Sequence, residues 1–122
     1  MYKVSLAIPI YNVSLFVERA LLSVLNQTYD NIEYLIVDDK GQDDSMDIVH
    51  RIIKDHPRGK DVRIIEHPYN IGLGATRNTA IDNAQGEYLF FMDSDDEIIP
   101  TCIEILVHKM QERSEEHTSE LQ

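Results

Sequence analysis

The sequence predicts an α/β fold, a Rossmann-like, doubly wound domain with a mainly parallel sheet. Short, nearly continuous apolar runs rich in β-branched residues recur along the chain, and such runs are typical of strands buried on both faces of a sheet. Segments with apolar residues at helical spacing alternate with them. This alternation favours parallel strands joined by right-handed crossovers.

The first strand is predicted over residues 3–10, a run in which Val and Ile are frequent. Ser14 follows, and serine is a residue type that caps helix N-termini. Across residues 15–27 the apolar positions recur at helical spacing. We therefore expect Ser14 to cap a helix over this segment.

The second strand is predicted over residues 32–37 and ends on Asp38-Asp39. An amphipathic helix is expected over 46–55, followed by a surface turn at 57–60, where Pro and Gly occur.

The third and fourth strands are predicted over residues 62–66 and 87–92, with a helix over 75–84 between them. Gly86 is expected to be the C′ residue of that helix, a position at which glycine is common. Pro100 is expected in the first turn of a last helix, where its missing N–H is tolerated.

Length and composition indicate a single globular domain. A chain of 122 residues is long enough for one hydrophobic core. With 43% hydrophobic and 27% charged residues, its composition argues against disorder. A single cysteine, Cys102, excludes an internal disulfide. No apolar run approaches the roughly 18–20 residues of a membrane span, and the start does not resemble a signal peptide. We expect a cytoplasmic domain.

The formal net charge of −11 makes nucleic acid or an anionic membrane surface an unfavourable non-specific partner. It does not exclude a phosphate ligand, because carboxylates bind phosphates through a divalent cation.

Residues 113–122 break the pattern of the preceding chain. Leu121 is the single large apolar residue of this segment, which resembles the translation of a sequencing-library adapter. We therefore expect residues 1–112 to be the native part, cut off at its C-terminus, and residues 113–122 to be a non-native tail. The alternative is a polar extension of the last helix.

Polar residues cluster where the predicted strands end. In an open parallel sheet, ligands bind outside the carboxyl ends of the strands. Asp38-Asp39 and residues 93–96 lie there, together with the glycine-containing loop 70–74. The Asp93-x-Asp95 spacing suits Mg²⁺ or Mn²⁺ bound together with a phosphate ligand, and Arg77 is a complementary charge for a pyrophosphate or a carboxylate. Taken alone, each feature also has a purely structural interpretation as a helix cap, a turn or a surface ion pair.

Other chemistry-bearing residues form no recognisable site. The glycines at 72 and 74 do not follow the first strand and therefore make no dinucleotide fingerprint. No Ser/His or Cys/His triad is apparent. We expect four histidines to be solvated: His50, His56, His67 and His108.

Five stretches, in this order and spacing, resemble the N-terminal nucleotide-binding part of a family 2 glycosyltransferase, the inverting type with a GT-A fold. They are residues 4–12, 22–28, 36–39, 70–78 and 86–96. Two positions depart from the family pattern. Lys40 stands where a small Gly-Ser pair usually begins, and Thr79 replaces a common glycine.

The resemblance implies a role for each matched site residue. Pro9 and Tyr11 would pack around a uracil-like base, from which Asp39 would accept a hydrogen bond. Arg77 and Asn78 would help to order the nucleotide pocket. Asp93 would face the ribose, and Asp95 would hold Mg²⁺ or Mn²⁺ on the diphosphate.

The implied reaction is transfer of a sugar, with inversion, from a nucleotide-sugar donor such as a UDP-sugar to an acceptor hydroxyl. The acceptor, a glycan or a lipid-linked sugar, is not specified. The catalytic base of the family comes from the acceptor-binding half, which is expected beyond the end of this chain. The chain would therefore hold the donor half and be inactive alone. A full-length relative would act in the cytoplasm or at the inner face of the membrane.

Two other functions are compatible with parts of the pattern. A non-catalytic nucleotide- or nucleotide-sugar-binding module would use the same pocket residues. A phospho-acceptor signalling domain also has an acidic pocket in a doubly wound fold. It fits poorly, because the acidic pair follows the second strand and no lysine ends a fifth strand.

Overall fold

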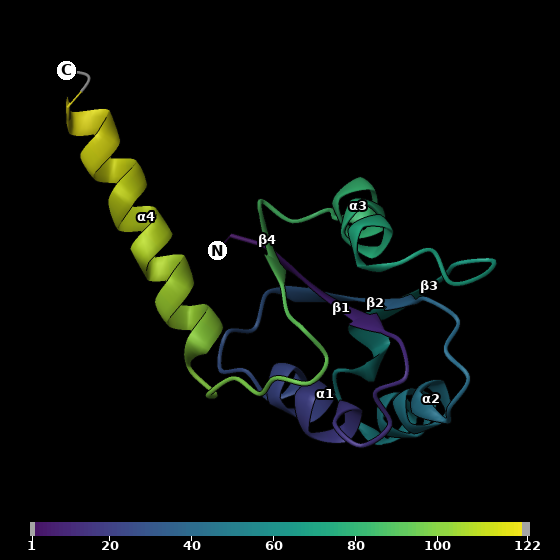
Figure 1. The fold of residues 1–122 in the computed structure, drawn as a ribbon. Coiled ribbons are helices and arrows are strands. Elements are labelled where there is room, and N and C mark those ends of the chain that lie inside the picture. The colour runs from purple at the N-terminus through teal and green to yellow at the C-terminus, as the bar shows by residue number, and fades with distance from the viewer. Residues whose placement is uncertain (1, 121–122) are drawn as a thin grey trace.

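A computed structural model describes the backbone of residues 2–120 and the side chains of residues 2–113 (Figure 1). Its elements are β1 (Val4–Ile10), α1 (Val17–Leu25), β2 (Ile32–Asp38), α2 (Ser45–Asp55), the 3₁₀ turn η1 (Gly59–Asp61), β3 (Val62–Glu66), α3 (Leu73–Asn83), β4 (Tyr88–Phe91) and α4 (Cys102–Glu120).

The four strands form one parallel sheet in the order β3-β2-β1-β4. β1 pairs with β2 in register from Val4↔Ile32 to Ile10↔Asp38. Helices α1 and α2 cover one face of the sheet and α3 lies on the other (Figure 1). The predicted α/β, doubly wound fold class is therefore confirmed.

The two central strands are buried along their whole length. Side chains alternate between the faces of a strand, so Leu6 and Ile8 join the main core formed with α1 and α2. Ala7 and Leu35 form a smaller cluster with Ala80 of α3 on the opposite face. The small side chains of Ala7 and Ala80 let α3 pack close to the sheet.

The first helix begins later than its sequence pattern suggests. Its N-cap is Phe16, which makes no capping hydrogen bond through its side chain. The prediction of Ser14 as N-cap is wrong. The backbone N–H of Ser14 instead donates to Asp43 Oδ2 at 3.0 Å, a partner on the next connection at the same sheet edge.

Gly86 does not cap α3. That helix has Ala84 as its C-cap, and Gly86 is not among the residues with positive φ. A Cβ atom on Gly86 would lie 2.7 Å from Lys3 O and 2.8 Å from Ser5 N. The glycine is needed for this close approach to β1, a signal that the local sequence does not reveal.

Helix α4 begins at Cys102, so Pro100 precedes it instead of occupying its first turn. Its first turns contribute Ile103 and Val107 to the core, and the helix then extends away from the sheet (Figure 1). The helical backbone continues to Glu120, while the side chains beyond Arg113 lie outside the described residues. Among the helices described, none combines the length and apolar character needed to cross a membrane.

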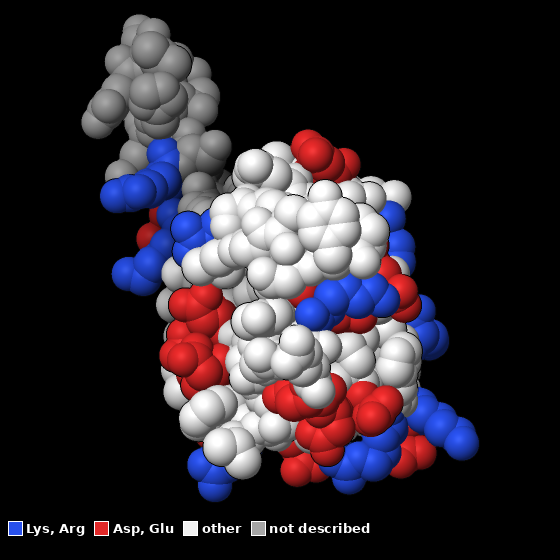
Figure 2. All heavy atoms as spheres, turned by 45° about the vertical axis from the view of Figure 1, so that its right-hand side comes forward, with Lys and Arg blue, Asp and Glu red and all other residues white. Residues whose placement is uncertain are grey.

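The acidic side chains are spread over one face of the molecule. On the face drawn in Figure 2, acidic side chains form several separate groups, and uncharged side chains lie between them. The net charge of −11 is therefore not concentrated at one site.

Candidate functional site

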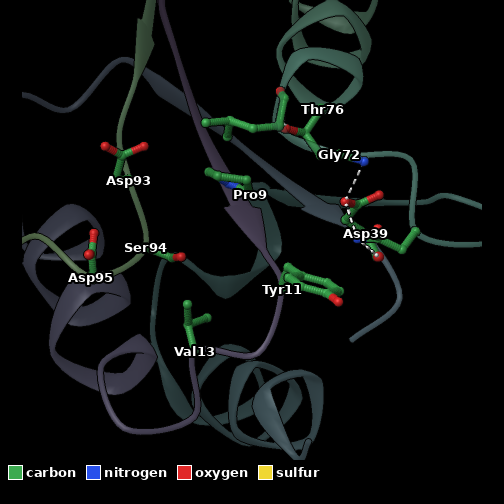
Figure 3. Close-up of a pocket in the computed structure, with 11 residues that line it drawn as sticks. Pro9, Tyr11, Val13, Asp39, Gly72, Thr76, Asp93, Ser94 and Asp95 are labelled. Atoms are coloured by element: carbon green, nitrogen blue, oxygen red, sulfur yellow. Dashed lines mark hydrogen bonds between the residues drawn. The ribbon is translucent and has the colours of Figure 1, made fainter. Parts of the chain in front are cut away.

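A pocket of about 500 Å³ opens at the carboxyl edge of the sheet, a volume within the range of small-molecule sites. It draws on the ends of β1, β2 and β4 and on the β3–α3 connection (Figure 3). The residues that line it are Pro9, Tyr11, Val13, Asp39, Asn70, Gly72, Leu73, Thr76, Asp93, Ser94 and Asp95.

Pro9 explains why the sheet opens at this point. β4 pairs with β1 up to Phe91↔Ala7, and Met92 N donates to Ala7 O at 2.9 Å. In this register Pro9 would make the next hydrogen bond through its backbone N–H, which proline lacks. The pairing ends there, and Asp93 continues along the pocket wall beyond the last paired residue.

Three carboxylates lie together where the chain leaves β4. Asp93, Asp95 and Asp96 each offer an oxygen within 4.8 Å of the others, and all three side chains are exposed. Among the ion pairs of the described residues, none involves these aspartates. Clustered carboxylate oxygens without a basic partner are a suitable donor set for Mg²⁺ or Mn²⁺.

Asp39 lies on the opposite side of the pocket and organises the β3–α3 connection. Its Oδ1 accepts hydrogen bonds from His67 Nδ1 at 2.8 Å and Ile71 N at 3.0 Å. Its Oδ2 accepts from Asn70 Nδ2 at 2.8 Å and Gly72 N at 3.0 Å. Four protein donors thus occupy the roughly four acceptor positions of one carboxylate.

The environment of Asp39 keeps it ionised. Burial alone would raise the pKa of this carboxyl, but hydrogen bonds from His67 and from the amides of Ile71 and Gly72 hold the pKa below its ordinary value. A ligand N–H that binds to Asp39 would have to share an oxygen with one of these donors.

His67 is buried, so the prediction that it is solvated is wrong. It follows β3 directly, with 5% of its surface exposed, and its ring contacts Asp39 and Thr79. Its position at the end of a strand was the available signal, because that edge also carries Asp38-Asp39. His50 and His108 are exposed, in line with the prediction.

Arg77 and Asn78 are not part of the pocket lining. Both are exposed on α3, and the guanidinium of Arg77 lies 5.3 Å from the ring centroid of Phe91. Thr76, the preceding residue, lines the pocket instead. The structure therefore brings Pro9, Tyr11, Asp39, Asp93 and Asp95 around one cavity and leaves the arginine and the asparagine outside it.

Lys40, which departs from the family pattern, adopts a left-handed backbone conformation with φ 56°. Its N–H donates to Asp38 Oδ1 at 2.9 Å, and its ammonium group lies 3.0 Å from Glu66 Oε2. These two contacts help to hold a conformation that is unusual for a residue other than glycine.

Comparison with known proteins identifies the family of this domain. Residues 5–116 match the family described as "Glycosyl transferase family 2". The chain belongs to this family. The match covers the sheet, the pocket and the start of α4, so the resemblance drawn from its motifs is confirmed.

Relatives of the family 2 domain include an enzyme whose name specifies its donor. The chain is 39% identical over 113 residues to "UDP-Glc:alpha-D-GlcNAc-diphosphoundecaprenol beta-1,3-glucosyltransferase WfaP" of Escherichia coli, covering 91% of this chain and 42% of WfaP. The chain spans about a third of the length of the curated relatives it matches first.

Solved structures with the same fold include two donor complexes. S. aureus TarS 1-349 in complex with UDP-GlcNAc aligns with a TM-score of 0.80 and 27% identity, covering 90% of this chain and 31% of that structure. The mannosyltransferase PcManGT from Pyrobaculum calidifontis, in complex with GDP-Man and Mn²⁺, aligns with a TM-score of 0.73 and 26% identity, covering 79% and 28%.

Proposed function

We propose that this family 2 domain binds the nucleoside diphosphate of a nucleotide-sugar donor, with a UDP-sugar as the donor class. The observation that carries the proposal is the pocket itself. A strand-end cavity of about 500 Å³ is lined by Pro9, Tyr11, Asp39, Asp93 and Asp95, with Asp39 on one side and the other two aspartates on the opposite side (Figure 3). The names of WfaP and of the TarS complex, which specify UDP-Glc and UDP-GlcNAc, support the choice of UDP.

In this proposal the base lies between Pro9 and Tyr11, and the ribose lies against Asp93. Asp39 shapes the wall beside the base. To bind the base as well, one Asp39 oxygen would accept hydrogen bonds from the base and from a protein donor at the same time. Arg77 and Asn78 order the pocket indirectly, through the position of the helix that also carries Thr76.

Mg²⁺ or Mn²⁺ would bind to Asp95, and the neighbouring Asp93 and Asp96 fit such an ion because all three offer hard oxygen ligands within 4.8 Å of one another. PcManGT, whose structure contains Mn²⁺, supports the use of a divalent ion. When bound, such an ion neutralises negative charge on the departing diphosphate.

The proposed reaction is sugar transfer with inversion to an acceptor hydroxyl, in a glycan or a lipid-linked sugar. Inversion requires a base that removes the acceptor proton on the face of the sugar opposite the departing diphosphate. We place this base outside the chain, so that the chain holds the donor half of the site. We further propose that the complete protein works in the cytoplasm, at the inner face of the membrane.

The test is metal-dependent UDP binding by the Asp95→Asn variant, measured by isothermal titration calorimetry with Mn²⁺. Loss of a charged ligand is expected to weaken the Mn²⁺-dependent affinity by at least about tenfold. Asp55→Asn is the matched control, since Asp55 is exposed and ends α2 at the far end of the sheet. Unchanged binding by the Asp95 variant would refute the metal assignment, and absence of UDP binding by the wild type would refute the donor pocket.

A further inference from the structure

We propose that His67 is a positioning residue for the donor pocket. Acting through Asp39, it holds the β3–α3 connection in the shape that forms one wall of the pocket. This inference rests on the proposed function, because it assigns to His67 an effect on nucleotide binding. His67 itself does not line the pocket.

Three elements meet at the imidazole ring. His67 directly follows β3, its Nδ1 lies 2.8 Å from Oδ1 of Asp39 after β2, and its Nε2 lies 2.7 Å from Oγ1 of Thr79 on α3. His67 is 5% exposed and Asp39 is 2% exposed, so this hydrogen bond is shielded from water. One side chain thus ties the ends of two strands to a helix.

The chemistry of the partners assigns the hydrogen on Nδ1. An ionised Asp39 only accepts hydrogen bonds, so the ring must donate to it from Nδ1. The hydroxyl of Thr79 lies 2.9 Å from Ala75 O as well as close to Nε2, so Nε2 can either donate to this hydroxyl or accept from it. The Nδ1–H donor toward Asp39 is required in both arrangements.

The Asp39 carboxylate transmits this constraint to the pocket wall. The Oδ1 atom that accepts from His67 also accepts from Ile71 N, and Oδ2 holds Asn70 Nδ2 and Gly72 N. Without the imidazole, three donors remain instead of four, and the carboxylate is held less firmly in its orientation. A change in that orientation would disturb the position of Asn70 and Gly72, both of which line the pocket.

Gly72 makes this wall sensitive to Asp39. Its φ of 97° is a left-handed conformation, and it is the N-cap of α3. Its amide is held by Asp39 Oδ2, so the start of α3 and the pocket residues Leu73 and Thr76 depend on that hydrogen bond.

Two amide variants of His67 separate positioning from general packing. His67→Asn places an amide N–H at the position of Nδ1, which keeps the donor to Asp39 and loses the contact with Thr79. His67→Gln places its amide at the position of Nε2, which keeps the contact with Thr79 and loses the donor to Asp39. Thr79→Val removes only the hydroxyl and is the matched control on the far side of the ring.

Binding of UDP with Mn²⁺ to the whole 122-residue chain is the first readout. His67→Gln is expected to weaken the affinity by about tenfold, the loss of one hydrogen bond to a charged group. His67→Asn and Thr79→Val are expected to stay within about threefold of the wild type. Wild-type affinity in His67→Gln, or an equal loss in Thr79→Val, would overturn the proposal.

Amide hydrogen exchange without nucleotide is the second readout. The Ile71 and Gly72 amides are expected to exchange at least about tenfold faster in His67→Gln and at the wild-type rate in Thr79→Val. Unchanged protection of both amides in His67→Gln would overturn the positioning role. Failure of the wild type to bind UDP would instead overturn the proposed function, and the exchange rates would still decide whether His67 positions this loop.

Discussion

At the scale of single residues, Glu33 shows how a carboxylate is held inside the molecule. It lies on β2, facing α3, with 8% of its surface exposed. Its Oε2 accepts hydrogen bonds from Ser5 Oγ at 2.5 Å and Gln85 N at 2.6 Å, and Arg63 lies 3.4 Å from Oε1. Burial would raise the pKa of Glu33, but these donors and the charge of Arg63 hold it below its ordinary value.

This lowered pKa predicts that acid destabilises the protein through Glu33. The unfolded chain, with the ordinary glutamate pKa of 4.5, takes up a proton at a higher pH than the folded chain does. The contribution of Glu33 is therefore complete above the ordinary value and is lost as the pH falls through it towards the folded pKa. Glu33→Gln should cost about 1–3 kcal/mol at neutral pH.

The measurement is urea unfolding of the wild type and Glu33→Gln at several pH values. The difference in unfolding free energy between the two should shrink as the pH is lowered. Glu112→Gln, an exposed change on α4, should follow the wild type at every pH. A constant difference between Glu33→Gln and the wild type across the acidic range would contradict the assignment.

At the scale of elements, the α3–β4 connection is fixed by how closely it approaches β1. Gly86 N donates to Ser5 Oγ at 2.8 Å, and Glu87 N donates to Lys3 O at 2.8 Å. The backbone of β1 occupies the space that a side chain at position 86 would need. This connection sets where β4 enters the sheet and hence where Asp93 emerges at the other end.

Two glycine substitutions test this packing in opposite directions. Gly86→Ala should destabilise the fold by about 1–3 kcal/mol, because its Cβ would lie 2.7 Å from Lys3 O and the backbone would have to shift. Gly74→Ala, in the first turn of α3 with nothing within 4 Å of its Cβ, should stabilise the protein by up to about 1 kcal/mol. Thermal unfolding measures both, and equal effects of the two substitutions would rule out the close-approach argument.

The strands were more predictable from sequence than the helix ends. The third strand has the predicted bounds, and the first two differ by one residue each. The two central strands, β1 and β2, are buried along their whole length and therefore appear in the sequence as nearly continuous apolar runs. Helix ends depend on contacts outside the helix. The amide of Ser14 bonds to Asp43, and α3 begins at Leu73 next to the loop held by Asp39.

At the scale of the whole molecule, the chain should bind its donor without transferring the sugar. Residues from three strand ends and from α3 line the pocket. The chain, however, spans about a third of the length of the curated relatives it matches first. A coupled assay for UDP release from UDP-sugars, with the 122-residue chain and a panel of acceptors, should show no acceptor-dependent turnover. Robust turnover would place the catalytic base inside this chain.

Residues 113–122 should be dispensable for the fold, as expected of a non-native tail. Among the α4 side chains that the structure describes, those buried in the core are Ile103 and Val107, which precede this segment. A chain that ends at Glu112 should keep the melting temperature within about 2 °C, which corresponds to less than about 0.5 kcal/mol for a domain of this size. A larger drop would show that the segment belongs to the folded unit.

The sequence by itself determined the fold class, the family and the edge of the sheet at which the pocket lies. These depend on patterns within single elements and on short motifs, such as the Asp-Ser-Asp-Asp run at 93–96, whose spacing can be seen along the chain. Only the tertiary structure decided that His67 is buried, that Gly86 must be small and that Arg77 lies outside the pocket. The reason is distance along the chain: the partner of His67 is 28 residues away, and Ser5 is 81 residues from Gly86. Local periodicity reports which face of an element is buried, whereas these roles arise when remote segments meet.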